Sequence, residues 1–194
     1  MVRWEPGARE RLQGAALELY ATRGFEQTTV AEIALAAGLS ERTFFRHFAD
    51  KREVLFGRQE DFQNGFVEHI ASRQVEGPPL AIVASAVIAG AEFFRVEMLP
   101  YSRHRQGVVD AHPELREREL LKMAALAGAI AEALRGRGIA EPAATLAAES
   151  GVTVFRVAFA QWLDAGDATR SLADVEREIF GDLQALTAAA SLTR

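Results

Sequence analysis

The sequence predicts an all-α fold, and two observations support that prediction. Apolar residues recur at spacings of three and four along most of the chain, as they do on the buried face of a helix. No segment has the clear period-2 alternation of a half-buried strand, and we find no internal repeat. We therefore expect an N-terminal helix-turn-helix domain of three helices at residues 1–56, followed by a larger helical domain at residues 57–194.

Local signals mark the ends of the first two helices. The first helix has an apolar face made of Leu12, Ala16, Leu19 and Tyr20. The tripeptide Arg23-Gly24-Phe25 stops it. Thr29 is placed to cap a second helix that begins at Val30, and Glu32 completes a capping box by reaching back to the amide of Thr29.

A tight turn separates the second helix from a third. Gly38 can take the left-handed conformation that favours a helix end, and Ser40 is placed to cap a helix over residues 41–47. In that helix Phe44 and Phe48 lie four apart and face the core. The remaining residues turn wholly or partly outward: Glu41, Arg42, Thr43, Phe45, Arg46 and His47.

These outward residues have the chemistry of a DNA reader. Arginine bonds a guanine edge bidentately in the major groove and threonine contacts a thymine methyl, so Arg42 and Thr43 in the first turn are candidate base contacts. Asp50 forms a D-x-x-E cap box with Glu53, from which we expect one long helix to run through Ile70. Lys51, at the positive end of that helix, suits a phosphate.

The segment TTVAEIALAAGLSERTFFRHFADKREVL resembles the DNA-binding domain of the TetR family of bacterial transcriptional regulators, and the likeness covers residues 8–56. The resemblance implies phosphate contacts from Thr29, Phe45 or its backbone, His47 and Lys51. It also implies base or backbone contacts from Glu41, Arg42, Thr43 and Arg46. The family often has tyrosine where this chain has Phe45, so any phosphate bond from that hydroxyl is absent, which leaves more of the contact to Arg46 or His47.

The charge distribution is compatible with DNA binding although the net charge is -5. Residues 1–60 hold nine basic and nine acidic residues, so the rest of the chain carries the whole negative excess. Residues 40–52 hold four basic residues, two acidic residues and His47. A local basic face on an acidic body is expected of a protein that reads DNA without coating it indiscriminately.

The larger domain shows further helices. Glu76-Gly77-Pro78-Pro79 marks a break, and the helix after it ends or kinks at Leu99-Pro100. We expect residues 101–113 to be irregular. Pro113 then begins a helix that two glycines stop, Gly136 and Gly138.

Two final helices, 142–164 and 171–190, are broadly apolar and predict a homodimer interface. Ser171 caps the second, whose apolar face is Leu172, Val175, Ile179, Leu183, Leu186 and Ala190. Two such helices packing on their copies would form a four-helix bundle, and the TetR resemblance also implies dimerisation through the last two helices. A dimer relates two helix-turn-helix domains (the reading heads) by a two-fold axis, which matches a palindromic operator in double-stranded DNA.

Several function classes are not expected. The chain has no cysteine, which excludes disulfides and thiolate metal sites and suits a reducing cytosol. No histidine pair has the i, i+4 spacing of a metal site, and we expect neither metal nor cofactor. The longest apolar run, residues 80–91, is too short to span a membrane, so we expect a cytoplasmic protein. No catalytic motif such as G-x-S-x-G or H-E-x-x-H is present, so we expect no enzyme.

The resemblance also implies a small-molecule effector inside the helical body. By position its pocket is lined by Phe94, Met98, His104, Phe155, Phe159 and Trp162, although aromatic residues in such positions also fill a core. We expect a homodimeric, ligand-responsive repressor that binds an inverted repeat, with activation left open. The alternative is a helical ligand-binding or interaction protein without sequence-specific DNA binding.

Overall fold

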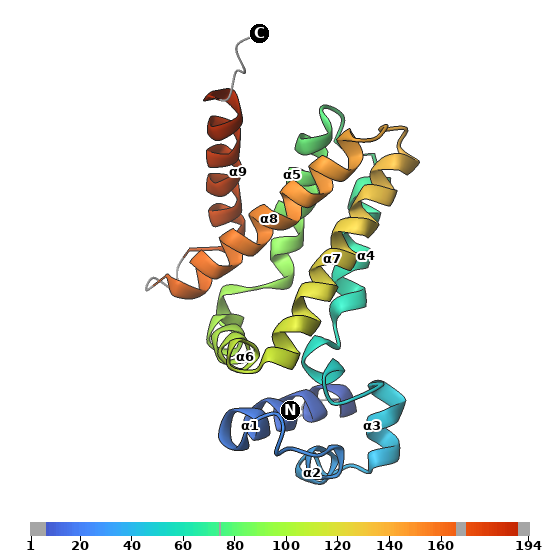
Figure 1. Ribbon diagram of the computed structural model, residues 1–194, viewed down its shortest axis with the longest axis vertical. Coiled ribbons are helices and arrows are strands. Elements are labelled where there is room, and N and C mark those ends of the chain that lie inside the picture. The colour runs from blue at the N-terminus through green and yellow to red at the C-terminus, as the bar shows by residue number, and fades with distance from the viewer. Residues whose placement is uncertain (1–6, 74, 166–169, 190–194) are drawn as a thin grey trace, which may run out of the picture. The chain divides into compact units, whose positions relative to one another are not determined.

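The computed structural model describes residues 7–73, 75–165 and 170–189, and every regular element in these ranges is helical (Figure 1). The predicted all-α class is confirmed. The chain divides into two compact units, residues 1–60 with 103–121 and residues 61–102 with 122–194. The first unit is thus made of two separate stretches of sequence, whereas the sequence predicts one boundary after residue 56.

The first unit contains α1 (Ala8–Arg23), α2 (Val30–Ala36) and α3 (Glu41–His47), which Figure 1 shows gathered into one bundle. α2 begins and α3 both begins and ends where the sequence predicts. A short 3₁₀ turn, η1 (Glu53–Phe56), follows. The core of this unit also takes in three residues from the second stretch of chain, Val108, Val109 and Leu115.

No long helix begins at Lys51, so that prediction is wrong. Asp50 does accept hydrogen bonds from two of the backbone amides that follow it, at 2.7 and 3.1 Å. The chain then forms η1, and α4 (Gln59–Ala71) starts only after it. The reason is that three consecutive residues turn inward, which the single buried face of an α-helix cannot accommodate: Val54, Leu55 and Phe56.

Residues expected to be irregular form a further helix, α6 (Leu99–Ala111). Pro100 is its second residue, where a backbone amide has no partner within the helix, so proline is compatible with the start of the helix and does not end it. α7 (Pro113–Gly136) follows and begins at the predicted proline. α6 starts in the second unit and continues in the first, and α7 does the reverse.

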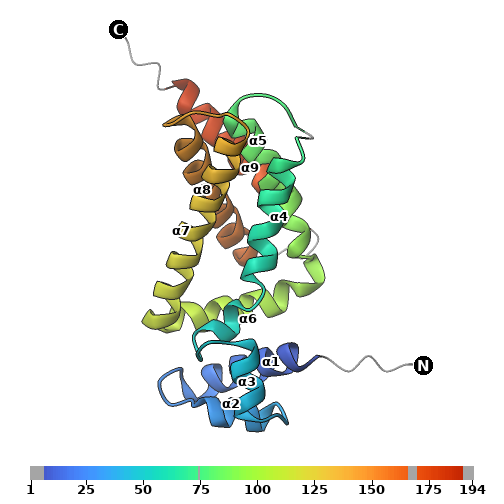
Figure 2. The same ribbon diagram turned by 90° about the vertical axis from the view of Figure 1, so that its right-hand side faces the viewer.

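The second unit has one core. Five of its helices supply most of the core residues: α4, the later part of α7, α5 (Pro79–Gly90), α8 (Ala143–Asp164) and α9 (Leu172–Ala189). The first residue of α6, Leu99, also belongs to this core. Figure 2 separates α4 from α7, which overlap in Figure 1. α5 packs on α8 and α9, and α8 packs on α9. Gly151 permits the close approach of α8 to α5, because a Cβ there would lie 2.2 Å from Cγ1 of Val83. Two 3₁₀ turns link α5 to α6: η2 (Ala91–Phe93) and η3 (Val96–Met98).

The last two helices lie where the sequence predicts them, and the backbone amide of Asp174 donates to the Ser171 hydroxyl at 3.2 Å, as expected of a cap. Most apolar residues of α8 are buried within the unit itself. The large apolar side chains that remain exposed on these helices are Leu146, Val157 and Leu186. Figure 1 shows the end of α9 extending beyond the helices on which it packs. Ala190, predicted for the α9 face, lies outside the described residues.

Among the described residues, α8 is long and apolar enough to cross a membrane by length and composition. A second candidate arises only if two segments bent by 62°, residues 79–93 and 96–111, are counted as one span. However, 44% of the apolar stretch of α8 is buried in the protein core. The core helices of soluble proteins meet the same criterion, so α8 gives only weak evidence for a membrane.

Candidate nucleic-acid interface

Local hydrogen bonds cap the starts of α2 and α3, and a glycine forms the turn between these two helices. The Thr29 hydroxyl accepts the amide of Glu32 at 3.2 Å, and the Glu32 carboxylate accepts the amide of Thr29 at 2.9 Å. Gly38 has φ of +67°, the left-handed conformation expected of it. Ser40 caps α3 by accepting the amide of Thr43 at 3.2 Å. The start of α3 is therefore determined by short-range bonds.

Two phenylalanines anchor α3 in the core of the first unit. Phe44 and Phe48 are buried, and their ring centroids lie 5.5 Å apart. Phe45 meets Phe44 edge to face, yet 56% of Phe45 is exposed. One side of α3 is thus fixed to the core, and the other side faces outward with an apolar ring among its polar groups.

The outer side of α3 presents two arginines. Arg42 and Arg46 are exposed and one helical turn apart, and neither forms an ion pair or hydrogen bond with the part of the chain that the structure describes. A guanidinium in this state has five donors available for a guanine edge or a phosphate. Glu41 is also exposed, whereas Thr43 is half-buried with its hydroxyl 3.0 Å from that of Ser40.

Two of the residues predicted to contact phosphates, Thr29 and His47, are partly withdrawn from the surface: one is bonded within the protein and the other is half-buried. The Thr29 hydroxyl lies 2.9 Å from Oε2 of Glu32, inside the capping box. Hydrogen bonds from Thr29, and to a smaller extent the charge of Arg23, hold the pKa of Glu32 below its usual value. His47 is half-buried and its Nε2 is enclosed without a hydrogen-bond partner, which leaves only Nδ1 for the predicted phosphate contact.

Lys51 is turned toward the turn between α1 and α2. Its ammonium donates to the carbonyl oxygens of Phe25 at 2.9 Å and Thr28 at 3.1 Å, with that of Glu26 at 3.5 Å. The same nitrogen lies 4.3 Å from the centroid of the Phe25 ring. The sequence did not suggest this arrangement, because the partners are more than twenty residues away along the chain and most are backbone atoms.

The structure brings together four of the six predicted effector residues. Phe94, Phe155, Phe159 and Trp162 form a chain of ring contacts with centroids 4.9 to 5.9 Å apart. Phe62 and Phe66, which the prediction omitted, extend this cluster. Met98 is 44% exposed and is not among the core residues of the second unit. His104 belongs to the first unit, with Nδ1 3.8 Å from Oε1 of Glu18.

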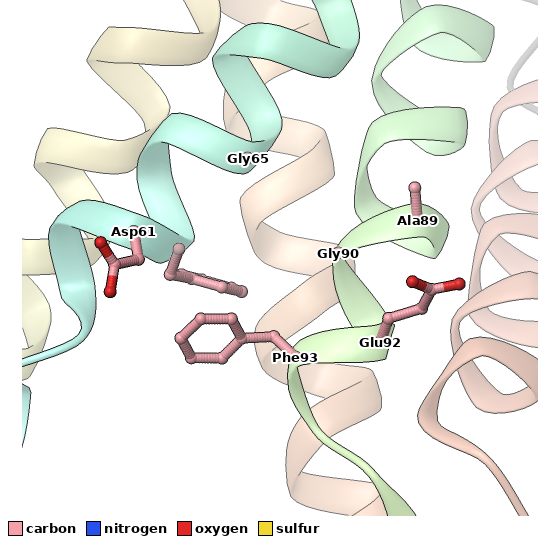
Figure 3. A pocket seen from close by; sticks show the side chains of 7 residues that line it. Asp61, Gly65, Ala89, Gly90, Glu92 and Phe93 are labelled. Carbon is pink, nitrogen blue, oxygen red and sulfur yellow. The ribbon is translucent and has the colours of Figure 1, made fainter.

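A shallow pocket of about 220 Å³ opens beside this aromatic cluster, between α4 and the end of α5. Figure 3 shows Asp61 and Glu92 at opposite ends, with the Phe93 ring between them. Gly90 lets the backbone come close to α4, because a Cβ there would lie 2.8 Å from the Phe66 ring. The lining residues are Asp61, Phe62, Gly65, Ala89, Gly90, Glu92 and Phe93.

One carboxyl group in the second unit is buried without a partner. Glu176 on α9 is fully buried, and neither of its carboxylate oxygens has a hydrogen-bond partner. Burial raises the pKa of Glu176 to about 8. No group of three or more His, Asp or Glu residues within the described ranges is arranged to hold a metal ion.

Two family models match the chain. That of "Bacterial regulatory proteins, tetR family" matches residues 14–56, which hold the capped turn and α3. That of "MftR C-terminal domain" matches residues 77–188, more than half of the chain. The protein belongs to the TetR family. The resemblance noted in its sequence is therefore confirmed, and the helix-turn-helix is that of a family of DNA-binding transcription regulators.

Two relatives within the TetR family are transcriptional regulators by name. The regulator TcmR of Streptomyces glaucescens is 38% identical over 78 residues, which cover 40% of this chain and 34% of TcmR. The putative mycofactocin biosynthesis regulator MftR of Mycobacterium tuberculosis is 32% identical over 111 residues, covering 54% of this chain and 52% of MftR. The matched segments thus span about a third and about half of these relatives.

Solved TetR-family structures share the fold. FadR of Thermus thermophilus, described as a repressor in complex with lauroyl-CoA, aligns with a TM-score of 0.55 at 24% identity, over 96% of both chains. A putative regulator from Syntrophomonas wolfei aligns with a TM-score of 0.60 at 14% identity, over 96% of this chain and 98% of its own. At these identities the likeness concerns the fold alone.

Proposed function

We propose that the protein is a homodimeric transcriptional repressor that binds an inverted-repeat operator in double-stranded DNA and is released by a small-molecule effector. It has no catalytic role in this proposal and acts in the cytoplasm, where its DNA lies. Membership of the TetR family supports the DNA-binding part of the proposal. The operator, the repressing mode and the effector response are the parts that we infer.

The observation that carries the proposal is the unpaired outer side of α3. Arg42 and Arg46 are the exposed cations of a capped helix whose other side is buried, so their direction is set by the fold. Arg42, in the first turn, would contact a base edge, and Arg46 a base or a phosphate. Glu41, Thr43 and Phe45 would complete the base-facing surface, with Thr29 and His47 at its edges.

A dimer follows from the surface that the last two helices leave uncovered. Leu146, Val157 and Leu186 are exposed by 63%, 49% and 71%. These side chains on α8 and α9 would pack against a second copy in a four-helix bundle. Two copies of α3 related by a two-fold axis would read the two halves of an inverted repeat, one helical turn of DNA or a multiple apart.

The effector would occupy the aromatic body of the second unit. The cluster of Phe94, Phe155, Phe159 and Trp162 and the pocket beside Phe93 are the places where an apolar ligand would be accommodated. Release requires that the effector bind better to a form whose reading heads no longer fit successive major grooves. Three helices have residues in both units, α4, α6 and α7, and they are the segments that would transmit the change.

Selection of bound sequences from a random duplex pool, at two salt concentrations, tests the proposal. An enriched inverted repeat is expected, and its spacing would report the distance between the two reading heads. Salt-sensitive binding without any enriched sequence, or no binding, would contradict it. Either of those results would favour a helical ligand-binding or interaction protein, in which the helix-turn-helix serves another purpose.

A further inference from the structure

We infer that the Lys51 side chain is a positioning residue that holds the turn between α1 and α2, and that it is not a phosphate contact. This inference rests on the proposed DNA-binding function, because its consequence is a correctly placed α2 and α3. The inference gives Lys51 a different role from Arg42 and Arg46, which have the same charge but no partner within the described chain.

The first argument is the geometry of the ammonium group. An ammonium has three N–H donors, and Lys51 has two carbonyl oxygens at 2.9 and 3.1 Å and a third at the limit of 3.5 Å. All three acceptors lie in the four residues 25–28. A phosphate would therefore have to displace bonds that the protein already provides, whereas the exposed arginines of α3 lose only water.

The second argument is that further contacts hold the lysine and its target together. The Tyr20 hydroxyl donates to the backbone carbonyl of Lys51 at 2.6 Å. Burial raises the pKa of Tyr20, so the phenol stays protonated and remains a donor. The Tyr20 and Phe25 rings meet edge to face at 5.2 Å, and the Lys51 ammonium lies over the Phe25 ring. Tyr20, Phe25 and Lys51 thus join α1, the turn and the chain after α3.

The turn at residues 25–28, held in this way, sets the position of α2 and through it that of α3. Thr28 is buried, and its hydroxyl donates to the carbonyl of Gly24 at 2.8 Å. Thr29 follows at once as the cap of α2, whose far end leads through Gly38 into α3. Removing the lysine bonds would let residues 25–28 move, and α2 and α3 would then have to be ordered when DNA binds, at a cost in affinity.

Salt dependence separates a positioning role from a phosphate contact. The affinity of a protein for DNA falls with salt in proportion to the number of phosphates it neutralises, and loss of one phosphate contact reduces the slope of log K against log salt by about one. A residue that only orders the protein changes the affinity and leaves this slope unchanged. The measurement is made on the full-length protein with the sequence enriched from the random pool.

Lys51→Met removes the charge and keeps the length of the side chain. We expect about tenfold weaker binding or more, with an unchanged salt slope. Lys51→Arg keeps the charge but replaces the compact ammonium by a planar fork, which cannot meet the same carbonyls, so we expect it to bind weakly too. Arg46→Met is the matched control, in which weaker binding should come with a slope reduced by about one.

Amide hydrogen exchange in the free protein supplies a second readout that does not depend on DNA. Lys51→Met should speed exchange in residues 24–32, and Tyr20→Phe should do the same without changing any charge. Arg46→Met should leave this segment unchanged. If no DNA sequence is enriched, the DNA-binding proposal fails, while the exchange measurement still tests whether Lys51 holds the turn between α1 and α2.

The inference is overturned if Lys51→Arg binds DNA like the unaltered protein while Lys51→Met reduces the salt slope by about one. It is also overturned if Lys51→Met leaves the exchange of residues 24–32 unchanged. The first result would assign the ammonium to a phosphate, as the family resemblance implies, and the second would show that it does not hold the turn.

Discussion

At the scale of single residues, charge alone does not decide which side chains are available to contact DNA. Arg46 and Lys51 are both cations of the helix-turn-helix segment, yet one is exposed without a partner and the other is bonded to backbone carbonyls. The sequence identified both as contacts because the residue types and their spacing match the family. Their different surroundings depend on the turn at residues 25–28, which only the folded chain brings near.

Arg42 is exposed without a partner in the described chain, and the proposed function assigns it a base edge of DNA. Its replacement by alanine should weaken binding to the selected operator by about 1–3 kcal/mol and relax the preference at one base position. Repeating the pool selection with the variant would show whether that position loses its preference. A uniform loss over all sequences would assign Arg42 to the DNA backbone instead of a base edge.

Glu176 makes stability depend on pH. Its folded pKa of about 8 lies above the ordinary value of 4.5, so the folded state binds a proton that the unfolded state has released between these two values. The contribution of Glu176 to stability should therefore be greatest below about pH 4.5, fall as pH rises, at up to about 1.4 kcal/mol per pH unit, and level off above pH 8.

Urea unfolding of Glu176→Gln from pH 5 to 9, at fixed protein concentration, tests this prediction. The amide cannot ionise, so the variant should lose much of the fall and be more stable than the unaltered protein at pH 9. The exposed Glu149→Gln should retain the full dependence. An unchanged pH profile in Glu176→Gln would show that this carboxyl group does not carry the effect.

At the scale of elements, local signals predicted well and long-range packing did not. The caps at Thr29 and Ser40 and the turn at Gly38 each depend on residues within three or four positions, and all three were predicted correctly. η1 and α6 were missed because their conformation depends on distant partners. Arg105 on α6, for example, donates to the carbonyl of Leu55 at 3.1 Å, across 50 residues of sequence.

In the candidate site too, features set by local sequence were predicted and features set by distant contacts were not. The sequence predicted that Arg42 and Arg46 face outward, because Phe44 and Phe48 fix the opposite side of the helix. Of the effector candidates, the aromatic residues do gather, since large apolar rings at helical spacing share a core. His104 does not join them, because α6 passes into the first unit after residue 102, and no local pattern indicates that change.

The packing of α8 on α5 depends on one glycine. Gly151→Ala should destabilise the protein by about 1–3 kcal/mol, since the new methyl group would lie 2.2 Å from Val83. The gain in helix propensity, up to about 1 kcal/mol, would not offset this overpacking. Gly128→Ala on α7, where a Cβ meets nothing within 4 Å, is the control and should stabilise slightly. Denaturant unfolding would measure both, and equal stability of the two variants would contradict the close approach.

At the scale of the whole molecule, the proposed regulator needs two copies. Most of the apolar residues that the sequence offered for the dimer interface on α8 are buried in the monomer instead. The face left for a partner is therefore narrower than predicted and centred on Leu146, Val157 and the later part of α9. The dimer would depend on fewer side chains, which makes it sensitive to single changes.

Leu186→Glu should shift the protein from dimer to monomer, because it places a charge where the proposed interface is apolar. The monomer should lose most of its affinity for the full inverted repeat and bind a half-site about as weakly as before. Leu120→Glu, at a leucine that is 54% exposed on α7, is the matched control and should remain dimeric. Light scattering after size exclusion would give the oligomeric state, and a dimeric Leu186→Glu would place the interface elsewhere.

The first unit is made of two separate stretches of the chain, and this limits how the proposed regulator can be recombined with others. The core of the first unit includes Val108, Val109 and Leu115, which come from beyond residue 100. A chimaera that grafts residues 1–60 onto the effector body of another regulator would leave this core without those three side chains. A chimaera that combines the DNA-binding part of one such protein with the effector-binding part of another should therefore fold only when residues 103–121 are transferred together with residues 1–60.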